Sequence, residues 1–243
     1  MEKEVVIEVK DLVTKLKNKI IHNKLNLKVF KNEILVIFGP SGEGKSVLLK
    51  TIVGLIKPYK GHVYVLGKDI PKLSQKELYE IRKKINYVFQ NDTLFDEYLV
   101  WENVMFYYLE HGLMEKSEAR KKALEYLKIV NLESHADYYP KELSGGQRKR
   151  VSIARVLSLN PDIILFDEPT SGLDPINTKN IHKLILDLKE KGKTCLLVSH
   201  DIQESLKIAD RVAFLYRGKI IFTGTPYEFK SCYIPVIRAF LGY

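Results

Sequence analysis

The sequence predicts an α/β fold with a parallel sheet at its centre. Three runs, residues 34–38, 163–166 and 194–198, are almost entirely apolar, as expected of parallel strands covered on both faces. The first two run directly into a glycine-rich and an acidic segment, and ligands of open parallel sheets bind at that end of the strands. At 243 residues with 45% hydrophobic content, the chain can bury a full core.

The part from Val5 to Phe89 alternates short strands with turns. Residues 25–29 alternate apolar and polar side chains with a period of two, which is typical of a half-exposed antiparallel strand. Ser74 and Glu77 form a capping-box pattern, so we expect a helix that begins there and ends near Lys84.

From Asn91 to about Leu159 the pattern becomes helical. Four apolar residues recur at helical spacing: Ala119, Ala123, Leu127 and Val130. Core strands return at Ile163, Thr194 and Val212, and residues 217–219 form a turn into a last strand at residues 220–222. The chain has no internal repeat, low-complexity tract or long linker.

The first apolar run leads into the sequence GPSGEGKS, residues 39–46, which is a Walker A pattern between a strand and a helix. Glycines let backbone N–H groups come close to phosphates, and the following helix adds its positive end. An ordinary glycine turn is the alternative, which this setting disfavours. Lys45 is expected to reach the β and γ phosphates and Ser46 to hold Mg²⁺. The predicted nucleotide-binding residues of this loop are Gly39, Pro40, Ser41, Gly42, Glu43, Gly44, Lys45, Ser46 and Val47.

The second apolar run ends on Asp167-Glu168-Pro169, which is a Walker B pattern. Asp167 is suited to Mg²⁺, and Glu168 can polarise a water molecule for in-line attack on a γ phosphate. Alone, this segment would be better interpreted as a solvated acidic turn after a core strand. Together with the Walker A loop it predicts a site that hydrolyses a nucleoside triphosphate.

A third motif, LSGGQ at residues 143–147, precedes a basic helix at residues 148–155. Its serine hydroxyl, glycine amides and helix N-terminus provide a second anion site. The three motifs in this order resemble the ABC ATPase family. The resemblance implies a P-loop NTPase (RecA-like) core with an antiparallel β subdomain and an inserted α-helical subdomain. It also implies that Ser144, Gly145, Gly146 and Gln147 contact the ATP of a second copy in a head-to-tail dimer that encloses two ATP and Mg²⁺.

The resemblance assigns three further residues and divides the chain. Gln90 resembles the glutamine that senses Mg²⁺ and the attacking water, Asp174 the aspartate that crosses the dimer interface, and His200 the histidine at the γ phosphate. The implied catalytic set is Lys45, Gln90, Glu168 and His200, with Ser46, Gln90 and Asp167 at the metal. Residues 1–90 and 160–243 form the nucleotide-binding core with its β subdomain, and residues 91–159 form the helical subdomain. At the position where this family stacks an aromatic residue on adenine, the chain has Leu16, which leaves the choice of ATP or GTP open.

Composition excludes several other classes of protein. The net charge is +9, but the lysines are scattered and interleaved with glutamates, so we expect solvated faces and no nucleic-acid partner, with attraction to an anionic membrane surface as a secondary use. The charged residues 1–4 are unlike a signal peptide, and no apolar stretch approaches the roughly 20 residues of a membrane helix. Cys195 and Cys232 lack metal-binding spacing, which fits the reduced cytosol.

Residues 89–111 indicate which ABC system the chain serves. They contain Leu94-Phe95-Asp96 and Glu102-Asn103-Val104, and resemble the Mla-type ATPase of MCE phospholipid transporters. This implies a subunit on the cytoplasmic face of the inner membrane of a diderm bacterium, with two permease subunits and, indirectly, a periplasmic MCE protein. The alternatives are the ATPase of a polar-substrate importer or of lipoprotein release, a soluble ABC protein, and a scaffold unable to hydrolyse ATP. At least half of the nearby aromatic residues are expected to pack in the core, and any exposed ones to line a groove for a permease helix. These residues are Trp101, Phe106, Tyr107 and Tyr108.

Overall fold

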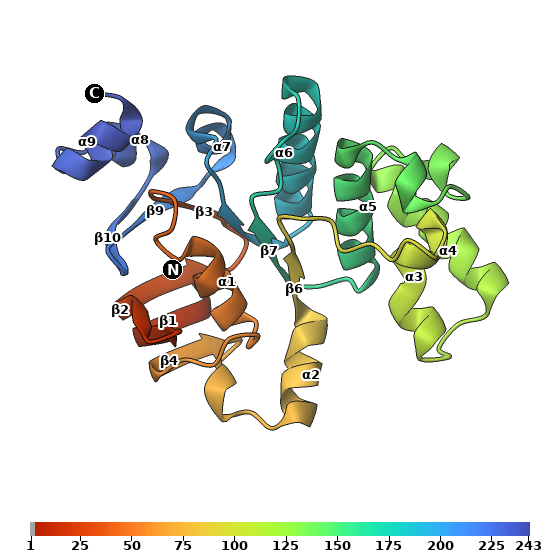
Figure 1. Ribbon diagram of the computed structural model, residues 1–243, viewed down its shortest axis with the longest axis horizontal. Helices are drawn as coiled ribbons and strands as arrows, with labels where there is room; N and C mark the ends of the chain where they lie inside the picture. Colours follow the sequence, from red (N-terminus) through yellow and green to blue (C-terminus); the bar gives the residue numbers. More distant parts are fainter. Residues whose placement is uncertain (1–2) are drawn as a thin grey trace.

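The computed structural model describes residues 3–243, and the first two residues of the charged N-terminus lie outside this range. A six-stranded sheet with the strand order β10-β9-β3-β8-β7-β6 forms the centre of the molecule (Figure 1). The strands from β9 to β6 are parallel, and β10 is antiparallel to β9. These strands are β3 (Ile34–Phe38), β6 (Ile85–Val88), β7 (Ile163–Asp167), β8 (Thr194–Val198), β9 (Arg211–Tyr216) and β10 (Lys219–Gly224).

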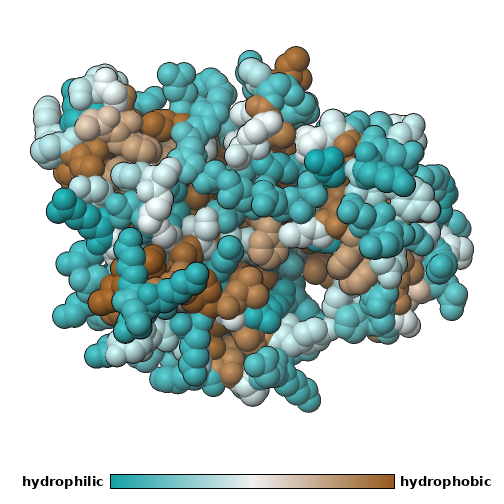
Figure 2. Space-filling view, viewed as in Figure 1, coloured by the Kyte–Doolittle hydropathy of each residue, from teal (hydrophilic) through white to brown (hydrophobic). Residues whose placement is uncertain are grey.

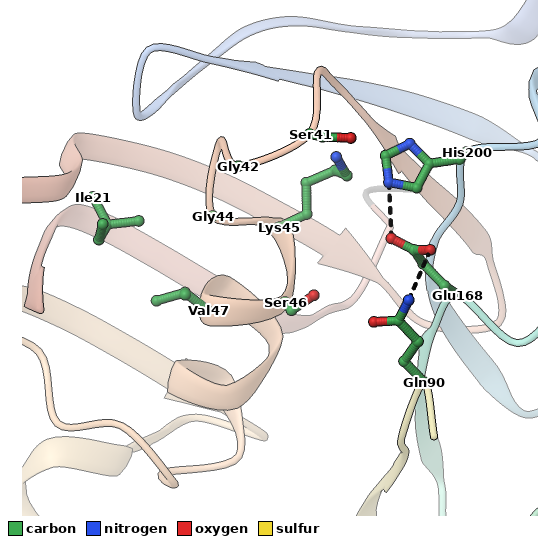
Figure 3. A pocket seen from close by; sticks show the side chains of 10 residues that line it. All are labelled: Ile21, Ser41, Gly42, Gly44, Lys45, Ser46, Val47, Gln90, Glu168 and His200. Carbon is green, nitrogen blue, oxygen red and sulfur yellow. Dashed lines mark hydrogen bonds and ion pairs between the residues drawn. The ribbon is translucent and has the colours of Figure 1, made fainter. Parts of the chain in front are cut away.

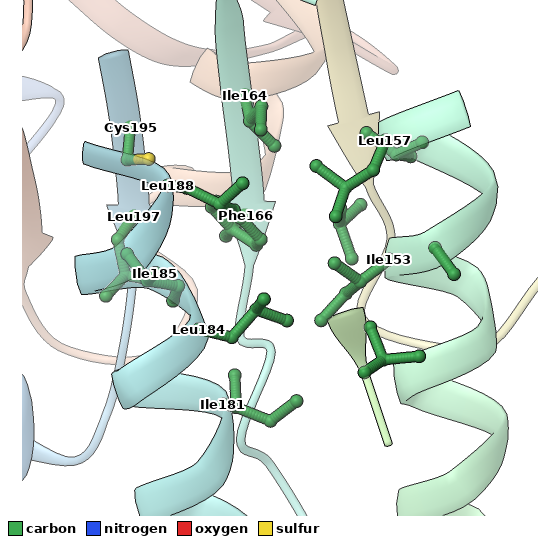
Figure 4. Packing of buried hydrophobic residues seen from close by; sticks show 14 of the residues in the cluster. Ile153, Leu157, Ile164, Phe166, Ile181, Leu184, Ile185, Leu188, Cys195 and Leu197 are labelled. Carbon is green, nitrogen blue, oxygen red and sulfur yellow. The ribbon is translucent and has the colours of Figure 1, made fainter. Parts of the chain in front are cut away.

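The three apolar runs of the sequence form β3, β8 and β7, three adjacent strands in the interior of this sheet. Every residue of β3, β7 and β8 is buried, because helices or the second sheet cover both of their faces. On one face, Ile153 and Leu157 pack toward Ile164 and Phe166 of β7, and the helix that carries Ile181 packs beside them (Figure 4). The prediction of an α/β fold with a buried parallel sheet is confirmed.

A second, antiparallel sheet has the order β2-β1-β4-β5. Its strands are β1 (Val5–Leu16), β2 (Lys19–Phe30), β4 (Lys60–Val65) and β5 (Lys68–Asp69). Leu25, Leu27 and Val29 are buried while the residues between them are exposed, as the period-two pattern predicted. This sheet shares a core with β3 and with α1 (Lys45–Ile52), and it therefore places β1 and β2 beside the phosphate loop.

The helices follow the sequence pattern closely. Helix α2 (Gln75–Lys84) begins at the predicted capping box, in which the Ser74 side chain accepts from the Glu77 N–H. Three helices from the middle of the chain gather to one side of the central sheet, and Ala119, Ala123 and Leu127 are fully buried among them (Figure 1). These three are α3 (Val100–Glu110), α4 (Lys116–Ile129) and α5 (Gly145–Ser158). The last four are α6 (Pro175–Glu190), α7 (Ile202–Ile208), α8 (Pro226–Lys230) and α9 (Pro235–Leu241).

The surface agrees with the charge pattern of the sequence. The face in Figure 2 is mostly hydrophilic, and hydrophobic side chains appear on it only in small patches, one near α1 and β1 and another near α8 and α9 (Figure 2). Within residues 3–243, no helix is long and apolar enough to cross a membrane.

Candidate functional site

A cavity of about 520 Å³ opens where β3 and β7 end, at the edge of the sheet predicted to bind ligands. Figure 3 shows that its side chains come from the phosphate loop, from β2 and from the ends of three strands (Figure 3). The cavity therefore brings together segments that are distant in the sequence. Its lining residues are Ile21, Ser41, Gly42, Gly44, Lys45, Ser46, Val47, Gln90, Glu168 and His200.

The phosphate loop has a backbone that only glycine allows at its critical turn. Gly44 has a φ of 95° and precedes the first residue of α1, and a Cβ there would lie 2.4 Å from Cγ2 of Ile21. The buried ammonium of Lys45 donates hydrogen bonds to the carbonyls of Gly39, at 2.7 Å, and Pro40, at 2.9 Å. Burial lowers the pKa of Lys45. The loop thus holds a desolvated cation at the N-terminus of a helix, which suits a bound polyphosphate.

Oxygen ligands suitable for Mg²⁺ lie at the junction of α1 and β7. The Ser46 hydroxyl donates to Oδ1 of Asp167 at 2.8 Å. The buried Tyr87 hydroxyl donates to the other carboxylate oxygen at 2.5 Å, so that Oδ1 is the oxygen presented to Ser46. Hydroxyl and carboxylate oxygens are ligands that Mg²⁺ prefers, and its remaining ligands in such sites are usually water and phosphate. No group of three or more His, Cys, Asp or Glu residues suited to a metal occurs in residues 3–243.

Glu168 is held by two side chains that face the same cavity. Its Oε1 lies 2.8 Å from Nε2 of His200, and its Oε2 accepts a hydrogen bond from Nε2 of Gln90 at 3.3 Å (Figure 3). The Glu168 side chain is only 14% exposed. A carboxylate, an imidazole and an amide therefore converge opposite Lys45 and Ser46, where they can orient and deprotonate a water molecule.

The predicted signature residues lie away from this cavity. Ser144 caps α5 and accepts from the Gln147 N–H, while the Gln147 side chain accepts from the Ser144 N–H. Neither residue lines the cavity, and the first turn of α5 has no acidic residue. A Cβ on Gly146 would lie 3.3 Å from Cγ of Asn177, so glycine lets α5 pack closely against the start of α6. Asp174 caps that helix by accepting from the N–H groups of Ile176 and Asn177.

Two residues beside the phosphate loop, Ile21 and His22, had no signal in the sequence. The fully buried His22 lies with Nε2 3.1 Å from the Gly44 carbonyl and Nδ1 2.6 Å from the Thr14 hydroxyl. Because a carbonyl can only accept, Nε2 carries the proton, and Nδ1 accepts from Thr14. The imidazole thus ties the β1 and β2 strands to the turn before Lys45. By contrast, Leu16, predicted at the base, is 37% exposed and does not line the cavity, whereas Ile21 does.

Burial gives His22 a measurable effect on stability. It lowers the pKa of the imidazole from 6.5 to about 4, so between these values the unfolded chain binds a proton that the folded chain excludes. The free energy of unfolding therefore falls as the pH drops through this window, by about 2 kcal/mol at pH 5 from this group. Urea titrations at pH 7.5 and pH 5 measure this effect. We expect the fall in the free energy of unfolding between the two pH values to be about 2 kcal/mol smaller in His22→Phe than in the wild type.

Thr14→Val is the matched control, because it removes a hydrogen bond but keeps the imidazole. It should retain the wild-type pH dependence of the unfolding free energy. An equal pH dependence in wild type and His22→Phe would contradict a depressed His22 pKa.

A parallel sheet with a phosphate loop after one strand and a carboxylate pair after another defines a P-loop ATPase. A family model described as ABC transporter matches residues 22–171, which is more than half of the chain. The chain belongs to the ABC transporter family, and it is an ABC-type ATPase.

Relatives from different transport systems are similar to the chain. The intermembrane phospholipid transport system ATP-binding protein MlaF of Haemophilus influenzae is 42% identical over 90% of this chain and 84% of its own length. The glycine betaine/carnitine transport ATP-binding protein GbuA of Listeria monocytogenes is 43% identical over 85% of the chain, which spans about half, 52%, of that relative. Among solved structures, the dimeric post-hydrolysis state of the ATP-binding cassette MJ0796 with ADP and Pi has a TM-score of 0.83 and 37% identity, covering 90% of this chain and 98% of that one.

Proposed function

We propose that this chain hydrolyses ATP with Glu168 as the residue that activates water. The observation that carries this proposal is the placement of the Glu168 carboxylate, between His200 and Gln90, in the same cavity as Lys45 and Ser46. Lys45 balances charge on the β and γ phosphates, and His200 holds the γ phosphate. Ile21 and Val47 offer apolar contact to the rest of the nucleotide but no aromatic stacking, so the choice between ATP and GTP depends on contacts beyond a stacked ring.

Mg²⁺ fits the oxygen ligands at the junction of α1 and β7. Ser46 and Asp167 would hold it, with the side-chain oxygen of Gln90, whose amide nitrogen already donates to Glu168, as a further ligand. When bound, the ion neutralises charge that develops on the transferred phosphoryl group. Tyr87 keeps Asp167 in place throughout, because its hydroxyl is committed to the second carboxylate oxygen.

The second part of the proposal is a head-to-tail dimer. The N-terminus of α5 has exposed Ser144 and Gly145 and no acidic residue in its first turn, which suits a phosphate. These residues lie outside the cavity of their own chain, so the phosphate they contact is that of a second copy. The dimeric cassette with ADP and Pi, at 37% identity, supports this arrangement.

The third part is coupling to a membrane permease. An apolar groove of about 260 Å³ lies beside the segment after Gln90 and is lined by aromatic residues of this segment and of α3, and by α5. Asn103 fixes the segment, because its buried amide bonds the Phe95 N–H and the carbonyls of Phe95, Tyr98 and Leu99. The residues that line the groove are Asn86, Tyr87, Phe95, Phe106, Tyr107, Arg155, Val156, Ser158 and Leu159. A permease helix in this groove would follow motion of residues 91–159, as a helical subdomain, against the core.

Within this scheme we assign the chain to phospholipid transport, at the cytoplasmic face of the inner membrane, with permeases and an MCE protein. Similarity to MlaF over 84% of that relative and the sequence of residues 89–111 support the assignment. An importer of polar substrates is the second candidate, because GbuA is equally similar. A transfer assay distinguishes the phospholipid transporter from the importer. The tagged chain is purified from its own membranes with its partners, reconstituted in proteoliposomes and tested for ATP-dependent phospholipid transfer. Substrate-stimulated ATPase activity without lipid transfer would favour the importer.

The groove leads to a test of permease coupling. Phe95→Ala removes a groove aromatic that is 38% exposed, and Asp96→Lys reverses an exposed charge next to it. We expect copurification of membrane subunits to fall about tenfold, because interface hot spots are often worth 1–2 kcal/mol or more. Basal ATPase of the isolated chain should stay within about twofold, since neither side chain lines the nucleotide cavity.

Tyr227→Ala is the control for loss of an exposed aromatic. Tyr227 is 79% exposed on α8, which is remote in sequence from the groove, and its removal should leave copurification intact. Undiminished copurification in both groove variants would exclude this groove as the permease site. The fully packed Trp101, only 7% exposed, belongs to the core and not to the groove.

A further inference from the structure

Lys149 is a buried lysine whose ammonium forms hydrogen bonds to the turn that carries Glu168. It lies in the second turn of α5 and is 7% exposed. Its Nζ donates hydrogen bonds to the carbonyl of Glu168 at 3.2 Å and to the carbonyl of Ser171 at 2.7 Å. Within residues 3–243 it forms no ion pair with a carboxylate, and burial lowers its pKa. Packing alone would be served better by an apolar side chain, because a buried cation loses its hydration.

The turn that Lys149 contacts has an unusual backbone. Glu168 has a φ of 49°, in the left-handed region that residues with a side chain rarely adopt. Its N–H donates to the Val198 carbonyl at 3.0 Å, and its own carbonyl accepts from the Ser171 N–H at 3.2 Å as well as from Lys149. Such a conformation persists when surrounding contacts hold it.

Backbone conformation decides where the Glu168 side chain points. With the N–H fixed to β8 and the carbonyl fixed to Lys149, the carboxylate is directed at His200 and Gln90 inside the cavity. If φ of Glu168 returned to the usual negative region while its N–H stayed on β8, rotation about the N–Cα bond would move the carbonyl and Cβ together. The carbonyl would then leave the ammonium and the carboxylate would leave His200 and Gln90. A displacement of about 1 Å in a reacting group can lower a rate by about a hundredfold.

We propose that Lys149 is a positioning residue for Glu168: from helix α5 it holds the left-handed turn that aims the catalytic carboxylate into the nucleotide cavity. This inference rests on the proposed role of Glu168 in activating water. The same helix presents Ser144 and Gly145 at its N-terminus, four or five residues before Lys149. Helix α5 therefore connects the residues proposed to contact a partner's phosphate with the turn that carries Glu168.

The test is Lys149→Met, which keeps the length and apolar character of the side chain but removes its N–H donors. We expect kcat for ATP to fall about 10- to 100-fold while KM and the Kd for ATP stay within about twofold, because the phosphate loop is untouched. Lys149→Gln retains an amide NH2 group with two N–H donors on a shorter side chain and should give an intermediate kcat. It also serves as the second variant if the methionine protein does not fold, which circular dichroism and thermal unfolding would reveal.

Tyr108→Phe is the matched control, because it removes one hydrogen bond from α3 to a backbone carbonyl of α5, that of Ser158 at 3.0 Å. It should lower the melting temperature with little change in kcat. A Lys149→Met kcat within twofold of wild type, or a loss equal to that of Tyr108→Phe, would overturn the inference. So would a raised KM at unchanged kcat.

A double variant separates this inference from the proposed function. In a Glu168→Gln background the orientation of residue 168 no longer limits hydrolysis, so adding Lys149→Met should change the single-turnover rate less than about twofold. An equal loss in both backgrounds would mean that Lys149 acts elsewhere, even if Glu168 is the base. High activity of Glu168→Gln alone would instead contradict the proposed function.

Discussion

Replacing Glu168 by Gln should lower the ATP turnover rate by about 10² to 10⁴-fold, the usual contribution of a general base, while ATP remains bound. An amide keeps the shape of the carboxylate but cannot take a proton from water. Among residues 3–243, Glu168 is the only acidic residue that lines the cavity, and the lysine, serine and glycines that would hold the phosphates are unchanged in the variant. Turnover and nucleotide retention are measured on the same purified protein, by phosphate release and by filter binding.

Glu204→Gln is the control for this change. It makes the same replacement on the neighbouring helix α7, where the carboxylate forms a surface ion pair with Lys207. Its turnover should match the wild type. Full activity in Glu168→Gln would remove Glu168 as the base, and loss of ATP binding would mean that the carboxylate serves binding and not chemistry.

Mixing Lys45→Ala protein with Ser144→Arg protein should restore ATP hydrolysis that neither has alone. Lys45→Ala empties the phosphate loop of its cation, and Ser144→Arg puts a bulky side chain where α5 would receive a phosphate. In a head-to-tail heterodimer, one site combines the intact phosphate loop of one chain with the intact α5 of the other. Random pairing makes about half of the dimers mixed, each with one intact site of two, so we expect about a quarter of wild-type activity.

The matched control mixes Lys45→Ala protein with chains that carry both substitutions. Heterodimers still form, but no site in them has Lys45, so activity should stay at the level of the parents. Heterodimer formation is verified with two affinity tags or by cross-linking. Confirmed heterodimers without added activity would argue that each chain completes its own site, and the dimer part of the proposed function would be abandoned.

The sequence by itself determined the class of fold and most of the cavity. The strand ends and the phosphate loop could be predicted because their functional residues are adjacent in the sequence. In residues 34–46 and 163–169, a buried strand is followed directly by glycines or carboxylates. The fold class and the ATPase family are confirmed. The helix after Ser74 and the buried alanines of α4 also followed from local patterns, since capping and helical periodicity involve neighbours in sequence.

The tertiary structure decided which residues hold the proposed catalytic residues in place. Lys149 stood in a basic run of the sequence, yet it is buried against the Glu168 turn, 19 residues away. His22 reaches Gly44 from β2, and Tyr87 reaches Asp167 from β6 across 80 residues. These contacts depend on the order β3-β8-β7-β6 and on the approach of the second sheet, which no short segment encodes. Burial also separated Trp101, which packs in the core, from Phe95, which is exposed, because the depth of a side chain depends on what the rest of the chain places over it.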